Sequence, residues 1–260
     1  MKVHSVNLKL QTFLKEHPID GVEIVDDPFR CNYLISGRYN KKNYNQDLKG
    51  VIIPYTGHNG IDLDELREDN VMLFVTPTRS KYVAEKARIH LGEDNSKKMI
   101  TIHLGGGCSM TAVKNGESVD TSLGFGPNEG LIMGSRSGAV DNSIIFYLVN
   151  NLGYDLNDVN NMLQKESGMI GLTGCLSDYR DIEAEAEKGD EKCQLALNMS
   201  AYRIKHYLGG YIANLNGVDA IIFTAGVGEN SIVLRKMVCE SMEFFGIEID
   251  EEKNDIKARK

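Results

Sequence analysis

The stretch Ile102-His103-Leu104-Gly105-Gly106-Gly107-Cys108-Ser109 decides how the larger part of this chain is interpreted. The residues from Met99 to His103 predict a strand, and a glycine triplet follows it. A backbone without Cβ atoms can approach a phosphate group closely and present several N–H groups to it. The same triplet also serves as a plain turn between strands. It fits neither a P-loop nor a dinucleotide fingerprint, because no Gly-Lys-Ser/Thr follows and Met110 stands at the third glycine position.

The residues around this stretch continue a mixed α/β pattern. Positions 81–91 predict a helix, and positions 110–114 and 117–121 predict two strands separated by Asn115-Gly116. Asn-Gly favours a type I′ turn, since both of its residues take positive φ, so a hairpin is expected. Apolar residues at helical spacing predict one long helix farther on: Ile204, Leu208, Tyr211 and Leu215.

A second glycine-rich segment, Thr224-Ala225-Gly226-Val227-Gly228-Glu229-Asn230-Ser231, follows a predicted strand at 219–224. Its glycines allow a flat ring or a sugar to lie on the backbone, and the start of the following helix offers free N–H groups to an anion. Asn230 or Ser231 serves equally well as an ordinary N-cap.

Two further segments carry charged residues among small ones. In Gly134-Ser135-Arg136-Ser137-Gly138, the planar guanidinium suits a carboxylate or a phosphate, and a structural salt bridge is the alternative. Glu166-Ser167-Gly168 leads to Ser177-Asp178-Tyr179-Arg180, where Ser177 is expected to be an N-cap. Asp178 and Arg180 are candidates for contacts to a ribose or a purine, or for simple capping and pairing.

The first part of the chain has a different composition. Only 5 of the 26 glycines precede residue 91, whereas four of the five prolines do, and we expect a domain boundary near residues 76–92. Apolar runs at 22–25, 33–35, 51–53 and 71–75, with helices near 8–14 and 62–66, predict a small α/β layer with a parallel sheet. The charged tail, Glu251 to Lys260, predicts a frayed end.

Charge and hydropathy exclude several classes of protein. The net charge of −8 argues against binding nucleic acid by phosphate neutralisation. No apolar run approaches the ~18–20 residues that span a bilayer, and no stretch resembles a signal peptide, so a cytoplasmic protein is expected. The five cysteines have no metal-type spacing, which predicts buried or idle thiols and no metal site.

Taken together, these segments resemble the acetate kinase family of the sugar-kinase/actin-like ATPase superfamily. The resemblance covers about residues 81–254. It rests on His103-Leu104-Gly105, on the runs at 119–125, 129–138, 166–168 and 177–182, and on the run at 223–231. It implies an α/β fold, with residues 81–260 forming an actin-like/ribonuclease H-like ATPase lobe.

The resemblance also implies a role for each segment. A phosphate loop is implied for His103, Leu104, Gly105, Gly106 and Gly107. Adenosine is implied to lie against Asp178, Tyr179, Arg180, Gly226, Val227, Gly228, Glu229 and Asn230. Arg136 is implied to be the catalytic arginine. The implied reaction is phosphoryl transfer from ATP, with Mg²⁺ carried by the nucleotide, to acetate, giving acetyl phosphate and ADP. A homodimer is implied as well.

The chain departs from the family pattern in three ways. The family usually has Asn where this chain has Gly106, and related carboxylate kinases resemble this chain in having Gly there. The family's first lobe, with its substrate arginine and catalytic aspartate, has no recognisable counterpart. The C-terminal segment with a magnesium-binding glutamate is not found after Asn254. We therefore expect impaired turnover, with an adenine-nucleotide-binding module without turnover as the alternative function.

Residues 1–87 resemble another family in place of that lobe. The segment from Leu48 to Leu66, with Pro54-Tyr55-Thr56-Gly57-His58-Asn59-Gly60-Ile61-Asp62, is similar to the outer domain of D-isomer-specific 2-hydroxyacid dehydrogenases. This implies a small flavodoxin-like α/β segment at residues 1–80. A dehydrogenase-related protein is the less favoured third hypothesis, because no nicotinamide fingerprint is present.

Overall fold

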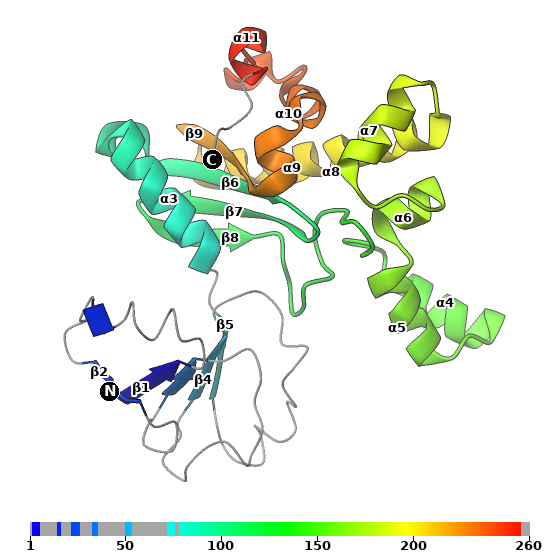
Figure 1. Cartoon of the computed structure of the whole chain (residues 1–260), viewed down its shortest axis with the longest axis horizontal. Helices are drawn as coiled ribbons and strands as arrows, with labels where there is room; N and C mark the ends of the chain where they lie inside the picture. The colour runs from blue at the N-terminus through cyan, green and yellow to red at the C-terminus, as the bar shows by residue number, and fades with distance from the viewer. Residues whose placement is uncertain are drawn as a thin grey trace. The chain divides into compact units, whose positions relative to one another are not determined.

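The computed structural model describes residues 2–5, 15–16, 22–26, 33–35, 50–53, 72–75 and 78–255. The chain divides into two compact units, Met1–Arg79 and Ser80–Lys260, each with its own sheet (Figure 1). The helices that the sequence predicts near 8–14 and 62–66 lie outside the described residues.

The first unit contains a five-stranded parallel sheet in the order β2-β1-β3-β4-β5. Its strands are β1 Lys2–Ser5, β2 Glu23–Ile24, β3 Tyr33–Ile35, β4 Gly50–Ile53 and β5 Met72–Val75. The predicted parallel sheet is thus confirmed. Strand β1 was not predicted, because Val3 is the single apolar residue in its four positions.

The second unit is built on a four-stranded sheet in the order β8-β7-β6-β9. Its strands are β6 Lys98–Leu104, β7 Cys108–Lys114, β8 Glu117–Thr121 and β9 Ala220–Thr224. Strands β6, β7 and β8 are antiparallel, whereas β9 runs parallel to β6. The predicted hairpin is confirmed, and both residues of its turn have positive φ, 52° for Asn115 and 82° for Gly116.

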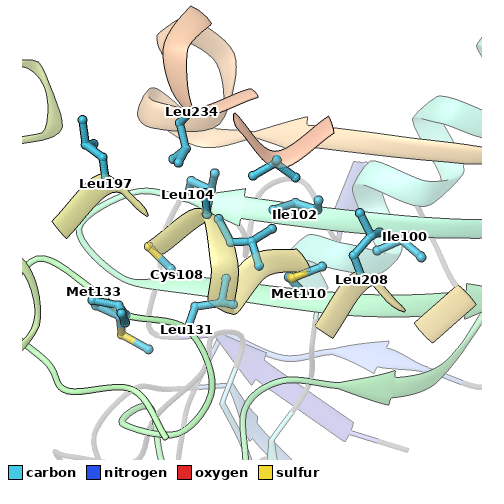
Figure 2. Close-up of a cluster of buried hydrophobic side chains, with 14 of the residues drawn as sticks. Ile100, Ile102, Leu104, Cys108, Met110, Leu131, Met133, Leu197, Leu208 and Leu234 are labelled. Atoms are coloured by element: carbon cyan, nitrogen blue, oxygen red, sulfur yellow. The ribbon is translucent and has the colours of Figure 1, made fainter. Parts of the chain in front are cut away.

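Helices cover both faces of this sheet. Successive side chains of β6 point to opposite faces, so this strand contributes to a core on each side. Ile100, Ile102 and Leu104 point into the main core, together with residues of the long helix α8, Glu191–Leu215 (Figure 2). Met99 instead packs with Ala84 of α3, Thr78–Leu91, in a smaller cluster. The predicted long helix is confirmed, and Ile204, Leu208, Tyr211 and Leu215 are all buried in it.

The remaining helices lie in two groups. Between β8 and α8 come α4 Ser143–Leu152, α5 Leu156–Lys165, α6 Gly168–Thr173 and α7 Tyr179–Glu187, which Figure 1 shows beyond the end of the sheet opposite α3. After β9 come α9 Ala225–Asn230, α10 Ile232–Cys239 and α11 Glu251–Asn254, and the short 3₁₀ helices are η3 Glu93–Asn95 and η4 Glu243–Phe245.

The expected frayed tail is wrong for residues 251–254. These residues form helix α11, and Asn254 at its end is buried. Hydrogen bonds of the Asn254 side chain hold this helix in place. The scarcity of apolar residues in the tail, on which the prediction rested, does not reveal them. Among the helices of the described residues, none combines the length and apolar character needed to cross a membrane.

Candidate functional site

The glycine triplet forms the tight connection between the antiparallel strands β6 and β7. The amide of Gly105 donates to the carbonyl of Gly107 at 3.2 Å, which closes the turn. Within the described part of the chain, the amides of Gly106 and Gly107 make no hydrogen bond. A Cβ placed on Gly106 would meet nothing within 4 Å. The turn therefore offers two open N–H donors on an unobstructed surface, as an anion-binding loop does.

Arg136 lies beside this turn. A Cβ placed on Gly107 would be 3.4 Å from Nη1 of Arg136. The guanidinium also makes a long contact, from Nη1 to Sδ of Met133 at 3.9 Å. Within residues 78–255, no carboxylate lies within salt-bridge distance of Arg136. The salt-bridge alternative that the sequence left open therefore does not hold there, and the guanidinium is available to an anion.

The loop that carries Arg136 is fixed by backbone hydrogen bonds to α5 and α6. The amide of Ser137 donates to Leu163, and the amide of Ser167 donates to Ser135, each at 3.0 Å. Gly168 allows the closest approach, because a Cβ there would lie 2.2 Å from the carbonyl oxygen of Met133 and 2.5 Å from that of Arg136. Its φ of +62° is also unfavourable for any other residue. Arg136 thus extends from a rigid loop.

The second glycine-rich segment lies next to the first. Strands β6 and β9 are parallel neighbours, and His103 pairs with Thr224 at their ends. Nδ1 of His103 is 3.1 Å from Oγ1 of Thr224. A Cβ placed on Gly105 would be 3.6 Å from Cβ of Ala225. Both glycine turns therefore meet at the carboxyl ends of neighbouring parallel strands, the usual place for ligands in α/β proteins.

Within α9, side chains bond back to the segment's own backbone. Nδ2 of Asn230 donates to the carbonyl of Gly226 at 2.8 Å, and Oε1 of Glu229 accepts from the amide of Ala225 at 3.1 Å. Ala225 has a φ of +66°, a strained value of the kind that clusters at functional sites. Ser231 resolves the open capping alternative, because its Oγ accepts from the amide of Leu234 and caps α10.

The segment Ser177-Asp178-Tyr179-Arg180 joins the site through Ser177. A Cβ placed on Gly134 would be 3.5 Å from the carbonyl oxygen of Ser177 and 3.7 Å from that of Gly106. Ser177 itself is not the N-cap of α7. Asp178 holds that position and accepts from the amide of Arg180 at 3.0 Å.

Asp178 and Arg180 form an ion pair with each other. Nη2 of Arg180 lies 2.6 Å from Oδ2 of Asp178. Hydrogen bonds from the side chain and then the backbone of Arg180 lower the pKa of Asp178 to about 2. Since the Arg180 side chain is 87% exposed and that of Asp178 is 40% exposed, both remain open to a ligand. The four segments that the sequence singled out are thus brought together in one unit.

The sequence profile described as the acetokinase family matches residues 75–260. This chain belongs to the acetokinase family.

Curated relatives of this acetokinase-family chain carry the name acetate kinase. The chain is 57% identical over 182 residues to the protein of Flavobacterium johnsoniae, which covers 70% of this chain and 45% of that protein. It is 52% identical over 183 residues to the protein of Acetivibrio thermocellus, with 70% and 46% covered. The chain therefore spans about half the length of the curated relatives it matches.

Solved structures agree in fold. The crystal structure of Porphyromonas gingivalis acetate kinase superposes with a TM-score of 0.68 at 38% identity, covering 79% of this chain and 52% of that one. A propionate kinase from Francisella tularensis gives a TM-score of 0.66 at 36% identity, covering 78% and 53%. A mixed α/β fold of the acetate kinase type is thus established for this family member.

Burial limits how four of the predicted ligand contacts of this acetokinase-family chain could act. Tyr179 is only 3% exposed, and its hydroxyl is 2.7 Å from Oγ of Ser200 inside the core. Burial raises the pKa of this phenol. The Leu104 side chain is likewise buried in the core. Because both side chains point inward, only the backbone of these residues is available to a ligand. Val227 also packs against the core, and Gly228 is buried.

Three further residues lie within the segments quoted from the sequence, but no contact in the site of this family member was predicted for them. Thr224 contacts His103, Ser177 lies against Gly134, and Gly168 receives the Arg136 loop. Only the first had a usable signal, since Thr224 ends one predicted strand as His103 ends another. The approaches to Ser177 and Gly168 depend on loops that fold back over long sequence separations.

Proposed function

We propose that this chain binds ATP at the two glycine turns and Arg136, and that it phosphorylates a short-chain carboxylate, with acetate as the first candidate. The observation that carries the proposal is the Arg136 guanidinium, which has no acidic partner among the described residues and lies beside the open amides of Gly106 and Gly107. Relatives named acetate kinase and propionate kinase support a carboxylate as the acceptor.

In the proposed reaction, a carboxylate oxygen of acetate attacks the γ-phosphorus of ATP. The bond from this phosphorus to the β–γ bridging oxygen breaks, and acetyl phosphate and ADP leave. Because such a transfer needs little covalent chemistry from the protein, positioning and charge stabilisation carry most of the catalysis. The open amides of the first turn hold phosphate oxygens, and Arg136 stabilises the charge on the transferring group.

The adenosine part of ATP is assigned to the second turn and to the start of α7. Gly226 is exposed and free of steric neighbours, Glu229 and Asn230 are exposed, and the Asp178–Arg180 pair remains accessible. His103 lies between the two turns through its contact with Thr224. Leu104, Tyr179, Val227 and Gly228 contribute backbone in this proposal, because their side chains, where present, face the core.

Magnesium is assigned to the nucleotide and not to a protein cage. The described residues contain no group of three His, Cys, Asp or Glu side chains that would hold a metal ion. Mg²⁺ commonly keeps several waters and binds through substrate phosphates, where it neutralises part of their charge. No step of the proposed chemistry at Arg136 or the glycine turns depends on a metal ligand from these residues.

Two measurements on the full chain test this function. Calorimetry with ATP and Mg²⁺ measures binding, and a coupled assay measures ADP release with and without acetate. Acetate-dependent ADP release supports the kinase. ATP binding without turnover favours the non-catalytic binding module instead, and tighter binding of NADH than of ATP would refute the nucleotide assignment.

For the first unit, we propose a flavodoxin-like segment at residues 1–80, similar to the outer domain of 2-hydroxyacid dehydrogenases. The strand order β2-β1-β3-β4-β5, with every pair parallel, supports it, because this is the order of flavodoxin-like folds. Residues 81–260 form the nucleotide-binding lobe in this proposal. Protease treatment that releases two folded pieces after a cut near residue 80 would agree with this division.

We further propose a homodimer, for which helix α4 is the supporting feature. None of its residues is buried, and its large aromatic residues Phe146 and Tyr147 are 64% and 54% exposed. An exposed apolar helix face favours association with another surface, and homodimers are the most frequent assemblies. Analytical ultracentrifugation should show a dimer for the wild type and a monomer for Phe146→Lys. The cytoplasmic location that the sequence indicates stays a prediction.

A further inference from the structure

Helix α11 is fastened to α10 by one buried side chain. Asn254 is 8% exposed, whereas its neighbours Glu251, Glu252 and Lys253 are exposed. Its Nδ2 donates to the carbonyl of Ile232 in α10 at 3.0 Å. A buried amide with satisfied donors and acceptors specifies a unique position for the segment that carries it.

Arg235 of α10 connects Asn254 to the second glycine turn. Its Nε donates to Oδ1 of Asn254 at 2.7 Å, and its Nη2 donates to the Asn254 carbonyl at 2.6 Å. Its Nη1 donates to the carbonyl of Gly228 at 3.0 Å. Within the part of the chain that the structure describes, Arg235 makes no ion pair. Burial lowers its pKa. Three nitrogens of one planar group thus join α11 to α9.

Gly228 is the residue at which the turn is most tightly packed. A Cβ placed there would be 3.4 Å from the carbonyl carbon of Phe223 and 3.6 Å from the carbonyl oxygen of Ile102. Three residues earlier, Ala225 takes its strained positive φ. A strained conformation persists only when its surroundings hold it. A hydrogen bond from a charged, half-buried donor to Gly228 is such a restraint.

We propose that Arg235 and Asn254 are positioning residues that hold segment 225–230 in the geometry needed for adenosine. Neither residue lies among the segments singled out as ligand contacts. The ligand part of this inference rests on the proposed function, whereas the coupling of Asn254 to the turn does not. Lysine cannot replace Arg235, because an ammonium lacks the fork that reaches both Asn254 and Gly228.

The chain offers a matched control for simple detachment of α11. Lys236 of α10, the residue after Arg235, forms an exposed ion pair with Glu251 of α11 at 2.6 Å. Lys236→Ala therefore removes the other tie between α10 and α11 without touching Gly228. An exposed pair of this kind contributes little to stability, so this variant should behave as the wild type.

The coupling is tested without nucleotide by amide hydrogen exchange of the full chain, followed by mass spectrometry. Asn254→Ala and Arg235→Lys should each increase exchange in peptides covering 225–231 at least tenfold, with α8 peptides unchanged as the internal reference. Lys236→Ala should leave both unchanged. Unchanged exchange at 225–231 in both variants, or equal acceleration in α8, would overturn the proposal.

Ligand affinity supplies the second measurement. ATP and inorganic tripolyphosphate are titrated into each variant below its melting temperature. ATP affinity should fall on the order of tenfold in Asn254→Ala and Arg235→Lys, since hydrogen bonds to a charged group are lost, while tripolyphosphate affinity stays within twofold. Equal loss for both ligands refutes a role specific to adenosine. If the wild type does not bind ATP, the proposed function is refuted. Increased exchange at 225–231 in the two variants would still support the positioning role of Arg235 and Asn254.

Discussion

The guanidinium of Arg136 lies against the backbone of Gly107, at 3.4 Å from where a Cβ of that residue would stand. The contact joins residues 29 positions apart and is made possible by the missing side chain. No carboxylate of the described residues holds Arg136 there, and its loop is instead bonded through backbone atoms to α5 and α6. The arginine is therefore positioned by packing, with its charge left for a ligand.

Arg136→Ala should lower kcat by about 10³-fold or more, because an arginine that stabilises a transferring phosphoryl group acts in the transition state. KM for ATP should change by no more than a few-fold. Arg136→Lys should recover little of the rate, since lysine lacks the planar fork. Steady-state kinetics with ATP and acetate make the comparison.

The control for Arg136 is Arg88→Ala in α3. Arg88 is an arginine in an exposed ion pair with Glu85 and Glu93, and its loss should leave both kcat and KM unchanged. An Arg136→Ala variant that keeps most of the wild-type rate would show that the assigned role is wrong. A parallel loss of thermal stability and ATP binding would indicate a structural role instead.

Gly168→Ala should destabilise the protein strongly. The new Cβ would overlap the carbonyl oxygens of Met133 and Arg136 at 2.2 and 2.5 Å, so the Arg136 loop must move away. We expect a loss of more than ~3 kcal/mol in the free energy of unfolding, at the upper end of single substitutions. Urea titration followed by circular dichroism measures it.

Gly174→Ala is the matched control, because Gly174 follows the same helix α6 with a φ of +92° but has no atom within 4 Å of the added Cβ. Only the backbone penalty of ~1–2 kcal/mol should remain. If the two variants lose equal stability, then the approach of α6 to the Arg136 loop is not what requires glycine at 168.

The elements of the second unit could be predicted because their signals are local. Asn115-Gly116 determines its turn by φ alone, and the strand before the first glycine turn differs from prediction by one residue at each end. The capping of α7 was misplaced by one residue, from Ser177 to Asp178, since both are good caps and tertiary packing chooses between them.

The site itself could be predicted only as separate segments. Its assembly depends on approaches such as Gly134 to Ser177 and Gly168 to Met133, which join distant loops and leave no periodic pattern. Burial was equally hidden at Tyr179, which lies between the partly exposed Asp178 and the exposed Arg180 in the sequence and yet points into the core. One residue of a helix turn faces inward while its neighbours face outward, and polarity of the neighbours does not reveal which.

Tyr179→Phe tests the buried role of this side chain directly. Removing the hydroxyl leaves Oγ of Ser200 without its partner in the core, so the free energy of unfolding should fall by ~1–3 kcal/mol. ATP affinity should stay within twofold of the wild type. The double variant with Ser200→Ala should recover part of the stability, because Ser200 then leaves no unpaired hydroxyl at this place in the core. A tenfold loss of ATP affinity in a fully folded Tyr179→Phe protein would show that the Tyr179 hydroxyl, and not only its backbone, serves the ligand site.

Cys108 should make stability depend on pH in the alkaline range. Burial raises the pKa of its thiol to about 11, against the smaller opposing effects of a backbone hydrogen bond with Gly105 and of the Arg136 charge. An unfolded cysteine loses its proton near pH ~8.5. Between these values the unfolded chain binds fewer protons than the folded one, so the free energy of unfolding falls as pH rises. Below pH ~8 the thiol is protonated in both states and contributes no slope.

Cys108→Ala removes this contribution and pays instead a cavity cost that does not depend on pH. The difference in unfolding free energy between wild type and variant should therefore shrink from pH 7.5 to pH 10, by ~1–2 kcal/mol at 1.36 kcal/mol per pH unit. Urea unfolding at pH 7.5, 9 and 10 measures the difference. A constant difference for Cys108→Ala across this range would mean that the thiol beside Arg136 ionises as readily in the folded protein as in the unfolded chain.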